Sequence, residues 1–152
     1  MDKFDRKILQ ALQTNARASL HEIGQAVGLS HSPCWNRIKK MEASGVIEGY
    51  TVRLNAAALN LSETVLVQVT LDSHSDNTLE KFGEVLAKIP EVVEAYLVSG
   101  DYDYLLRIAV NGTQEYERLL REKLYKIKGI RHSKSSFVLR TLKKADLPLL
   151  PV

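Results

Sequence analysis

The hydrophobic pattern of the chain changes its period near residue 62, and this change divides the sequence into two parts. Before that point, apolar residues recur every three to four positions, which is the spacing of short amphipathic helices. Beyond it, alternating apolar and polar stretches are interspersed with helical stretches, which is typical of a mixed sheet-and-helix domain. We therefore expect two domains, residues 1–61 and residues 62–152.

Two short helices are predicted first. The stretch DRKILQALQ carries an apolar stripe at helical spacing. In SLHEIGQAVGLS, Ser19 and Glu22 form a capping box, because each side chain satisfies a free backbone amide at the start of the helix. Gly28 is expected to end this second helix, since glycine adopts the left-handed conformation without strain.

A third helix is predicted from Ser32, as the N-cap, and Pro33, at the first helical position, to a stop at Gly45. One face is apolar, with Cys34, Ile38 and Met41. At about 100° per residue, the opposite face carries Ser32, Asn36, Lys39, Lys40 and Ala43. The next stretch, VIEGYTVRLN, alternates as a short linker strand or wing would. The pattern leaves open whether Trp35 packs against a neighbouring element or lies against DNA.

Two short helices joined by a glycine-containing turn, the second polar and basic, are typical of a winged-helix-like helix-turn-helix domain. Charge supports this interpretation. Residues 1–61 hold eight Lys/Arg and five Asp/Glu, whereas residues 62–152 hold thirteen of each, so the first part carries the whole net charge of +3. We expect it to bind double-stranded DNA. The candidate contacts are Ser30, His31, Ser32, Asn36, Arg37, Lys39, Lys40 and Arg53. The alternative is a three-helix bundle with a solvated basic face.

The second part follows the order βαββαβ, with a hairpin turn at Gly100 and Asp101 and a long last helix that ends at Gly129. This order predicts a ferredoxin-like α+β domain, in which a four-stranded antiparallel sheet carries both helices on one face. The other face of such a sheet stays uncovered. We expect a second copy of the chain to bury it, so a homodimer is the smallest assembly expected.

The stretch VSGDYDYLL places two carboxylates, Asp101 and Asp103, in an apolar run. Both acids fit a solvated turn. Acid–base catalysis is disfavoured because the sequence offers no matched His, Lys or metal constellation, and a hard-metal site needs more oxygen ligands. The ammonium group of an amino-acid effector fits better, and the two acids remain alternatives for holding it. We therefore expect neither enzymatic activity, nor a metal, nor a cofactor.

Composition bears on the location of the protein and on the role of its cysteine. No apolar run approaches the roughly 20 residues of a membrane helix. The N-terminal stretch MDKFDRKILQ lacks the apolar segment of a secretory signal, so we expect a cytoplasmic protein without membrane contact. Cys34, the only cysteine, lies on the apolar face of its helix and is interpreted as a core residue.

The motifs VGLSHSPCWNRIKKMEASGVIEGYTVRLN and LVSGDYDYLL, in this order of elements, resemble the Lrp/AsnC family of transcription regulators. The resemblance runs from about Phe4 to Lys143. It implies DNA binding by the first domain, amino-acid binding by the second, and dimers that assemble to tetramers or octamers. It places an effector pocket between dimers, lined by Gly100, Asp101, Tyr102, Asp103, Tyr104, Ser133, Ser135 and Ser136.

Two other functions remain alternatives at the level of sequence. One is an architectural DNA-binding protein without an effector. The other is a ferredoxin-like small-molecule-binding protein that does not bind DNA. His31 and Trp35 stand where relatives often carry other residue types, which leaves the operator sequence open.

Overall fold

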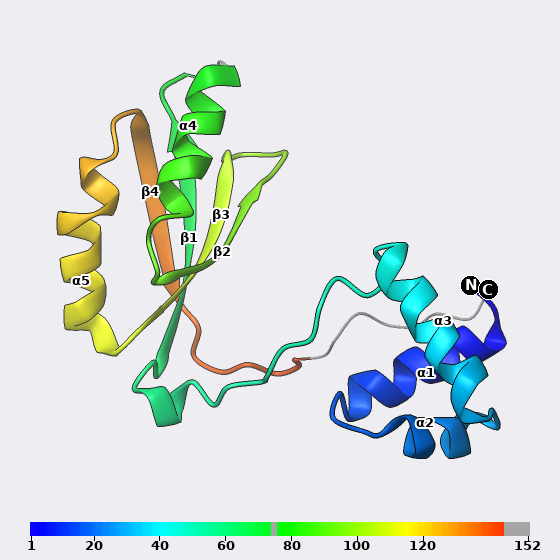
Figure 1. The fold of residues 1–152 in the computed structure, drawn as a ribbon. Coiled ribbons are helices and arrows are strands. Elements are labelled where there is room, and N and C mark those ends of the chain that lie inside the picture. Colours follow the sequence, from blue (N-terminus) through cyan, green and yellow to red (C-terminus); the bar gives the residue numbers. More distant parts are fainter. Residues whose placement is uncertain (74–75, 145–152) are drawn as a thin grey trace. The chain divides into compact units, whose positions relative to one another are not determined.

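In the computed structural model, residues 1–73 and 76–144 are described, and they build two compact units (Figure 1). The first unit is built on Met1–Arg53 and the second on Leu54–Leu142. The second unit begins at Leu54, whereas the change of hydrophobic period predicted a second domain from residue 62.

The first unit is a bundle of three helices: α1 (Lys3–Thr14), α2 (Leu20–Val27) and α3 (His31–Ala43). Each helix contributes to one small core, whose buried residues are Ile8, Ile23, Val27, Cys34, Ile38 and Met41. These positions are the apolar stripes that the helical spacing predicted. Cys34 is fully buried, in agreement with its interpretation as a core residue.

The start of α3 lies two residues earlier than the sequence predicted. The helix begins at His31 after Ser30, and Ser30 makes no side-chain capping bond. Ser32 is therefore inside the first turn and is not the N-cap. Pro33 still fits there, because the amides of the first turn have no intrahelical acceptor and proline loses no hydrogen bond.

The prediction of a linker strand or wing after α3 is wrong. Between Ser44 and Ser62 the only regular element is a short 3-10 turn, η1 (Ala57–Leu59). Most side chains from Val46 to Leu54 are exposed. Alternating residues alone do not make a strand, because its backbone groups need a partner strand, and no strand within residues 1–73 and 76–144 pairs with them.

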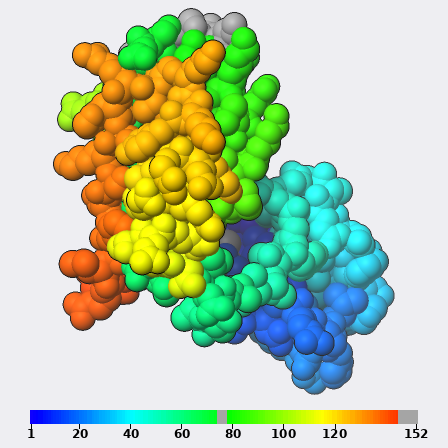
Figure 2. Space-filling view, turned by 90° about the vertical axis from the view of Figure 1, so that its left-hand side faces the viewer, coloured from blue at the N-terminus to red at the C-terminus, as the bar shows by residue number. Residues whose placement is uncertain are grey.

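The second unit has the predicted ferredoxin-like order: β1 (Glu63–Leu71), α4 (Asp76–Leu86), β2 (Val92–Leu97), β3 (Tyr104–Val110), α5 (Gly112–Glu122), the 3-10 turn η2 (Leu124–Lys126) and β4 (Ile130–Phe137). The strand order in the sheet is β2-β3-β1-β4, and all three neighbouring pairs are antiparallel. In the space-filling view, β4 (orange) forms an edge of the unit beside α5 (yellow) (Figure 2).

The core of this unit lies between the sheet and its two helices. Alternate residues of β1 and β3 are buried there, from Val65 to Leu71 and from Tyr104 to Val110. Phe82 and Leu86 of α4 and Tyr116 and Leu119 of α5 complete it. The two helices therefore cover the same face of the sheet, as the sequence predicted.

Two connections differ from the prediction. The hairpin is wider than a two-residue turn, because β2 ends at Leu97 and β3 begins at Tyr104, with the amide of Val98 bonded to the carbonyl of Asp103 at 2.9 Å. The last helix ends at Glu122 and tightens into η2, so Gly129 precedes β4 without ending the helix. The apolar spacing of the sequence continues from α5 into η2, so it did not indicate where the α-helix ends.

The other face of the sheet carries no helix of the chain. Its strand positions alternate with the buried ones and include Leu66, Tyr96, Leu105 and Ala109, of which Leu66 and Tyr96 are 36% and 51% exposed. Arg107 and Glu94 form an ion pair at 2.6 Å among them. This face is therefore partly apolar with a central charge pair.

Candidate DNA-binding and effector sites

The turn between α2 and α3 is fixed by backbone contacts of two glycines. The capping box of Ser19 and Glu22 is present at the start of α2, as predicted. At the other end, Gly28 adopts a left-handed conformation (φ 79°). The amides of Gly28 and Leu29 both donate to the carbonyl of Gly24 at 2.9 Å. A Cβ atom added at Gly24 would lie 2.6 Å from the carbonyl oxygen of Leu29. The turn therefore passes so close to α2 that only glycine fits at this position.

Helix α3 presents a polar and basic face opposite its buried residues. Ser32, Asn36, Lys39 and Lys40 are all exposed, and so are Ser30 and His31 at the start of the helix. Asn36 follows Ser32 by four positions, and Lys39 and Lys40 follow Asn36 by three and four, so all of them share one side of the helix. Arg53 is exposed beyond the helix. An exposed face of this composition suits a phosphate backbone and base edges.

Arg37 differs from the other predicted DNA contacts, because its partly exposed guanidinium is paired with two carboxylates of the same unit. One nitrogen lies 2.7 Å from a carboxylate oxygen of Asp2 and 2.7 Å from one of Asp5. The same group lies 5.5 Å from the centre of the Phe4 ring. Arg37 therefore ties α3 to the start of α1, and the side chain is not free to reach DNA while these bonds persist.

The contacts with backbone amides and with Arg37 lower the pKa values of both carboxylates. The backbone amide of Asp5, followed by Arg37, lowers the pKa of Asp2 below its usual value. Burial raises the pKa of Asp5, but the amide of Asp2 and the guanidinium of Arg37 outweigh it, so this pKa is lowered as well. Both acids are charged at neutral pH and act as acceptors for Arg37.

Trp35 forms part of the exposed surface of α3, at 44% exposure. The ammonium of Lys39 lies 4.6 Å from the centre of its ring, within the range of a cation–π contact. Lys39 also pairs with Glu42 at 2.8 Å, and Glu42 accepts a hydrogen bond from the hydroxyl of Tyr50. The sequence analysis did not predict this cluster, although the three-residue spacing of Lys39 and Glu42 is a signal for such a pair.

The two hairpin carboxylates have different surroundings. The Asp103 carboxylate accepts the amide of Leu71 at 2.7 Å, and the Asp103 amide donates to the carbonyl of Val69 at 2.9 Å. Asp103 therefore fastens the hairpin to the end of β1. Asp101 is exposed at the tip of the turn, beside Gly100, whose φ of 132° favours glycine.

The predicted effector-site residues are not all brought together. Tyr104 is buried, and its hydroxyl donates to the carbonyl of Leu79 in α4 at 2.8 Å. Tyr104 and Ser133 both pair with Val69 of β1, so the hairpin and Ser133 lie at the same end of the sheet. Ser135 lies further along β4, hydrogen-bonded to the hydroxyl of Tyr116. Ser136 pairs with Leu66 and so faces the uncovered side.

Within residues 1–73 and 76–144, no group of three or more His, Cys, Asp or Glu side chains is arranged to hold a metal ion. In the same ranges, no helix has the length and apolar character needed to cross a bilayer.

A helix-turn-helix unit with an exposed basic helix, joined to a ferredoxin-like unit, defines an effector-responsive transcription regulator. Two family models match the chain: the AsnC-type helix-turn-helix domain over residues 1–42, and the Lrp/AsnC ligand binding domain over residues 64–148. The chain belongs to the Lrp/AsnC family, and the resemblance seen in its motifs is confirmed.

Individual relatives agree with this family. The leucine-responsive regulatory protein of Escherichia coli (strain K12) is 37% identical over 146 residues, which span 96% of this chain and 89% of that protein. An AsnC family transcriptional regulator from Agrobacterium tumefaciens has a TM-score of 0.93 at 41% identity, covering 98% of this chain and 97% of its own. A transcriptional regulator from Neisseria meningitidis, in complex with L-Met, has a TM-score of 0.93 at 33% identity, with the same coverage of 98% and 97%.

Proposed function

We propose that the exposed face of α3 enters the major groove of double-stranded DNA and that the chain acts by binding, in the cytoplasm, without catalysing a reaction. The observation that carries this proposal is the division of α3 into a buried face and a face on which Ser32, Asn36, Lys39 and Lys40 are exposed. In the proposed complex the lysines neutralise phosphates, and Asn36 and Ser32 reach base edges. Ser30, His31 and Arg53 add contacts at the margins, whereas Arg37 positions α3 through Asp2 and Asp5.

The salt dependence of DNA binding tests this orientation. Lys40→Gln removes one phosphate contact, so affinity falls on every sequence and the slope of log K against log salt decreases by about 1. Lys7→Gln is the matched control, because Lys7 is an exposed lysine of α1 in the same unit. An unchanged slope for Lys40→Gln, or an equal loss for Lys7→Gln, contradicts the proposal. Asn36→Ala is expected to change base preference in a selection from random DNA.

The effector is proposed to be an amino acid that binds at the tip of the hairpin, with its ammonium on Asp101. Asp101 is preferred over Asp103 because the Asp103 carboxylate already accepts the amide of Leu71. Backbone amides around Gly100, together with Tyr102, would receive the carboxylate of the effector, and Ser133 lies at the same end of the sheet, across β1. The relative bound to L-Met and the leucine-responsive relatives support an amino acid of apolar side chain.

Calorimetric titration with L-methionine and L-leucine separates the two acids. Asp101→Asn is expected to abolish binding while the protein keeps its thermal stability. Asp103→Asn is expected to lower the unfolding temperature, because it weakens the bond that fastens the hairpin to β1. Binding of both amino acids to Asp101→Asn with the affinity of the natural sequence contradicts this assignment.

A second copy of the chain is proposed to cover the free face of the sheet, and dimers are proposed to join further into tetramers or octamers. Leu66, Tyr96, Leu105 and Ala109 supply the apolar surface for the first contact. Sedimentation velocity with Leu66→Glu tests the dimer, since a charge there opposes burial. A monomer at all concentrations in the natural sequence contradicts it. Adding the amino acid tests whether the effector prefers one assembly, as a switch requires.

A further inference from the structure

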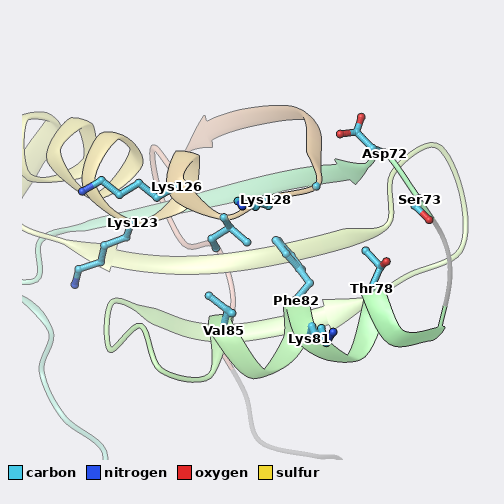
Figure 3. Close-up of a pocket in the computed structure, with 11 residues that line it drawn as sticks. Asp72, Ser73, Thr78, Lys81, Phe82, Val85, Lys123, Lys126 and Lys128 are labelled. Carbon is cyan, nitrogen blue, oxygen red and sulfur yellow. The ribbon is translucent and has the colours of Figure 1, made fainter.

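A groove of about 610 Å³ lies on the helix side of the second unit, between α4 and the segment that joins α5 to β4. Figure 3 shows Phe82 and Val85 extending from α4 towards the segment that carries Lys126 and Lys128. The apolar floor consists of Phe82, Val85 and Ile127, of which Val85 is 39% exposed. Its volume is in the range of small-molecule sites.

The rim of the groove is positively charged. Lys81, Lys126 and Lys128 line it, are exposed, and have no ion-pair partner among residues 1–73 and 76–144. Lys123 also lines the groove, but both carboxylate oxygens of Glu91 hold its ammonium, at 2.6 and 2.7 Å. Asp72 contributes one negative charge. Three unpaired ammonium groups and one carboxylate therefore surround an apolar floor.

We propose that this groove is a second ligand site, which binds a small organic carboxylate with an apolar body. The carboxylate pairs with the lysines of the segment between α5 and β4, Lys126 or Lys128, where the excess positive charge of the rim favours an anion. The apolar body covers Val85 and Ile127, beside the buried Phe82 ring, and removes their exposed surface from water. An inorganic anion would leave that floor exposed, and an uncharged apolar molecule would leave the lysines unpaired, so neither matches both halves of the groove.

This groove is separate from the proposed amino-acid site, but one groove residue contacts the start of β3, next to the hairpin. None of the described groove residues belongs to the hairpin segment 100–104. The Phe82 ring nevertheless lies 4.8 Å, centre to centre, from the ring of Tyr104, the first residue of β3. Asp72 directly follows Leu71, whose amide binds Asp103. The test must therefore distinguish binding in the groove from binding at the hairpin.

Calorimetric titration of the full chain with 3-phenylpropionate tests the proposal. This probe carries one carboxylate and an apolar ring. Two control probes each lack one of these groups: 3-phenylpropionamide has no negative charge, and inorganic phosphate has no apolar body. We expect saturable binding of 3-phenylpropionate and an affinity lower by about tenfold or more for the other two. Binding of phosphate or of the amide as tightly as the carboxylate overturns the proposal, as does the absence of saturable binding at millimolar concentrations.

Variants then locate the site. The double change Lys126→Gln with Lys128→Gln, and separately Val85→Asp, are expected to weaken 3-phenylpropionate binding about tenfold or more. Lys88→Gln, an exposed lysine outside the groove, is the matched control. Asp101→Asn must leave this binding unchanged, because it affects only the hairpin. Thermal unfolding of each variant verifies that it is folded. Full affinity in the double lysine variant, or its loss in Asp101→Asn, overturns the proposal.

Discussion

The turn between α2 and α3 makes a sharp prediction for the substitution Gly24→Ala. Alanine is the better helix former, by about 1 kcal/mol, so helix propensity alone predicts stabilisation. The structure predicts the opposite sign. The added methyl group would lie 2.6 Å from the backbone oxygen of Leu29, whereas ordinary contacts begin at 3.4 Å, so the turn must move by about 0.8 Å.

A backbone carbonyl cannot rotate away from such a contact as a flexible side chain would. The shift also strains the two hydrogen bonds that the amides of Gly28 and Leu29 donate to the carbonyl of Gly24. Overpacking of this kind costs about 2–3 kcal/mol. After the gain in helix propensity is subtracted, we expect Gly24→Ala to destabilise the first unit by about 1–2 kcal/mol.

Urea unfolding followed by tryptophan fluorescence measures this effect, because Trp35 is the only tryptophan and reports on the first unit. Gly83→Ala is the matched control. Gly83 is also a helix-interior glycine, but no atom lies within 4 Å of its added methyl group, so this change is expected to stabilise the second unit by about 0.5–1 kcal/mol in circular dichroism. A Gly24→Ala protein that unfolds at the same urea concentration as the natural sequence, or at a higher one, refutes the argument.

Three further predictions concern contacts within each unit. Arg37→Gln should lower the urea midpoint at pH 7, and this effect should shrink as the pH is lowered. Folding lowers the pKa values of Asp2 and Asp5, so their contribution is present above about pH 4 and is lost as the pH falls through the folded values. Leu106→Ala should cost about 2–5 kcal/mol in chemical unfolding, because Leu106 is fully buried. Tyr104→Phe should cost about 1 kcal/mol in the same assay, because it removes the hydrogen bond to α4, and an unchanged midpoint would contradict this.

The helices and strands of both units were predictable because their signals are local. The capping box of Ser19 and Glu22 spans four residues, and the alternation in β1 repeats every second residue. Such signals depend on the backbone geometry of one element and need no knowledge of its neighbours. The exposed face of α3 follows from the same kind of pattern, since Cys34, Ile38 and Met41 define the side that is buried.

The roles of Arg37 and Asp103 were not predictable, because their partners are remote in the sequence. Arg37 contacts Asp2, 35 positions earlier, and Asp103 accepts the amide of Leu71, 32 positions earlier. In the sequence, Arg37 looks like one more cation of a basic helix, and Asp103 looks like a duplicate of Asp101. Only the packing of α1 against α3, and of the hairpin against β1, gives these side chains a structural role, whereas Lys40 and Asp101 stay exposed and are the proposed ligand contacts.

The excess positive charge of residues 1–61 therefore supports DNA binding only through those cations that are not already paired within the first unit. The surplus of +3 lies in residues 1–61, but Arg37 is neutralised by two carboxylates and Lys39 shares its charge with Glu42. Lys40 is the one cation of α3 without an ion-pair partner in the described part of the chain. An exposed pair such as Lys39–Glu42 is weak, so in the proposed complex a phosphate replaces Glu42 while Lys39 keeps its contact with the Trp35 ring. Lys40 needs no such exchange, and for this reason its removal should change the salt dependence more directly than any other single substitution in α3.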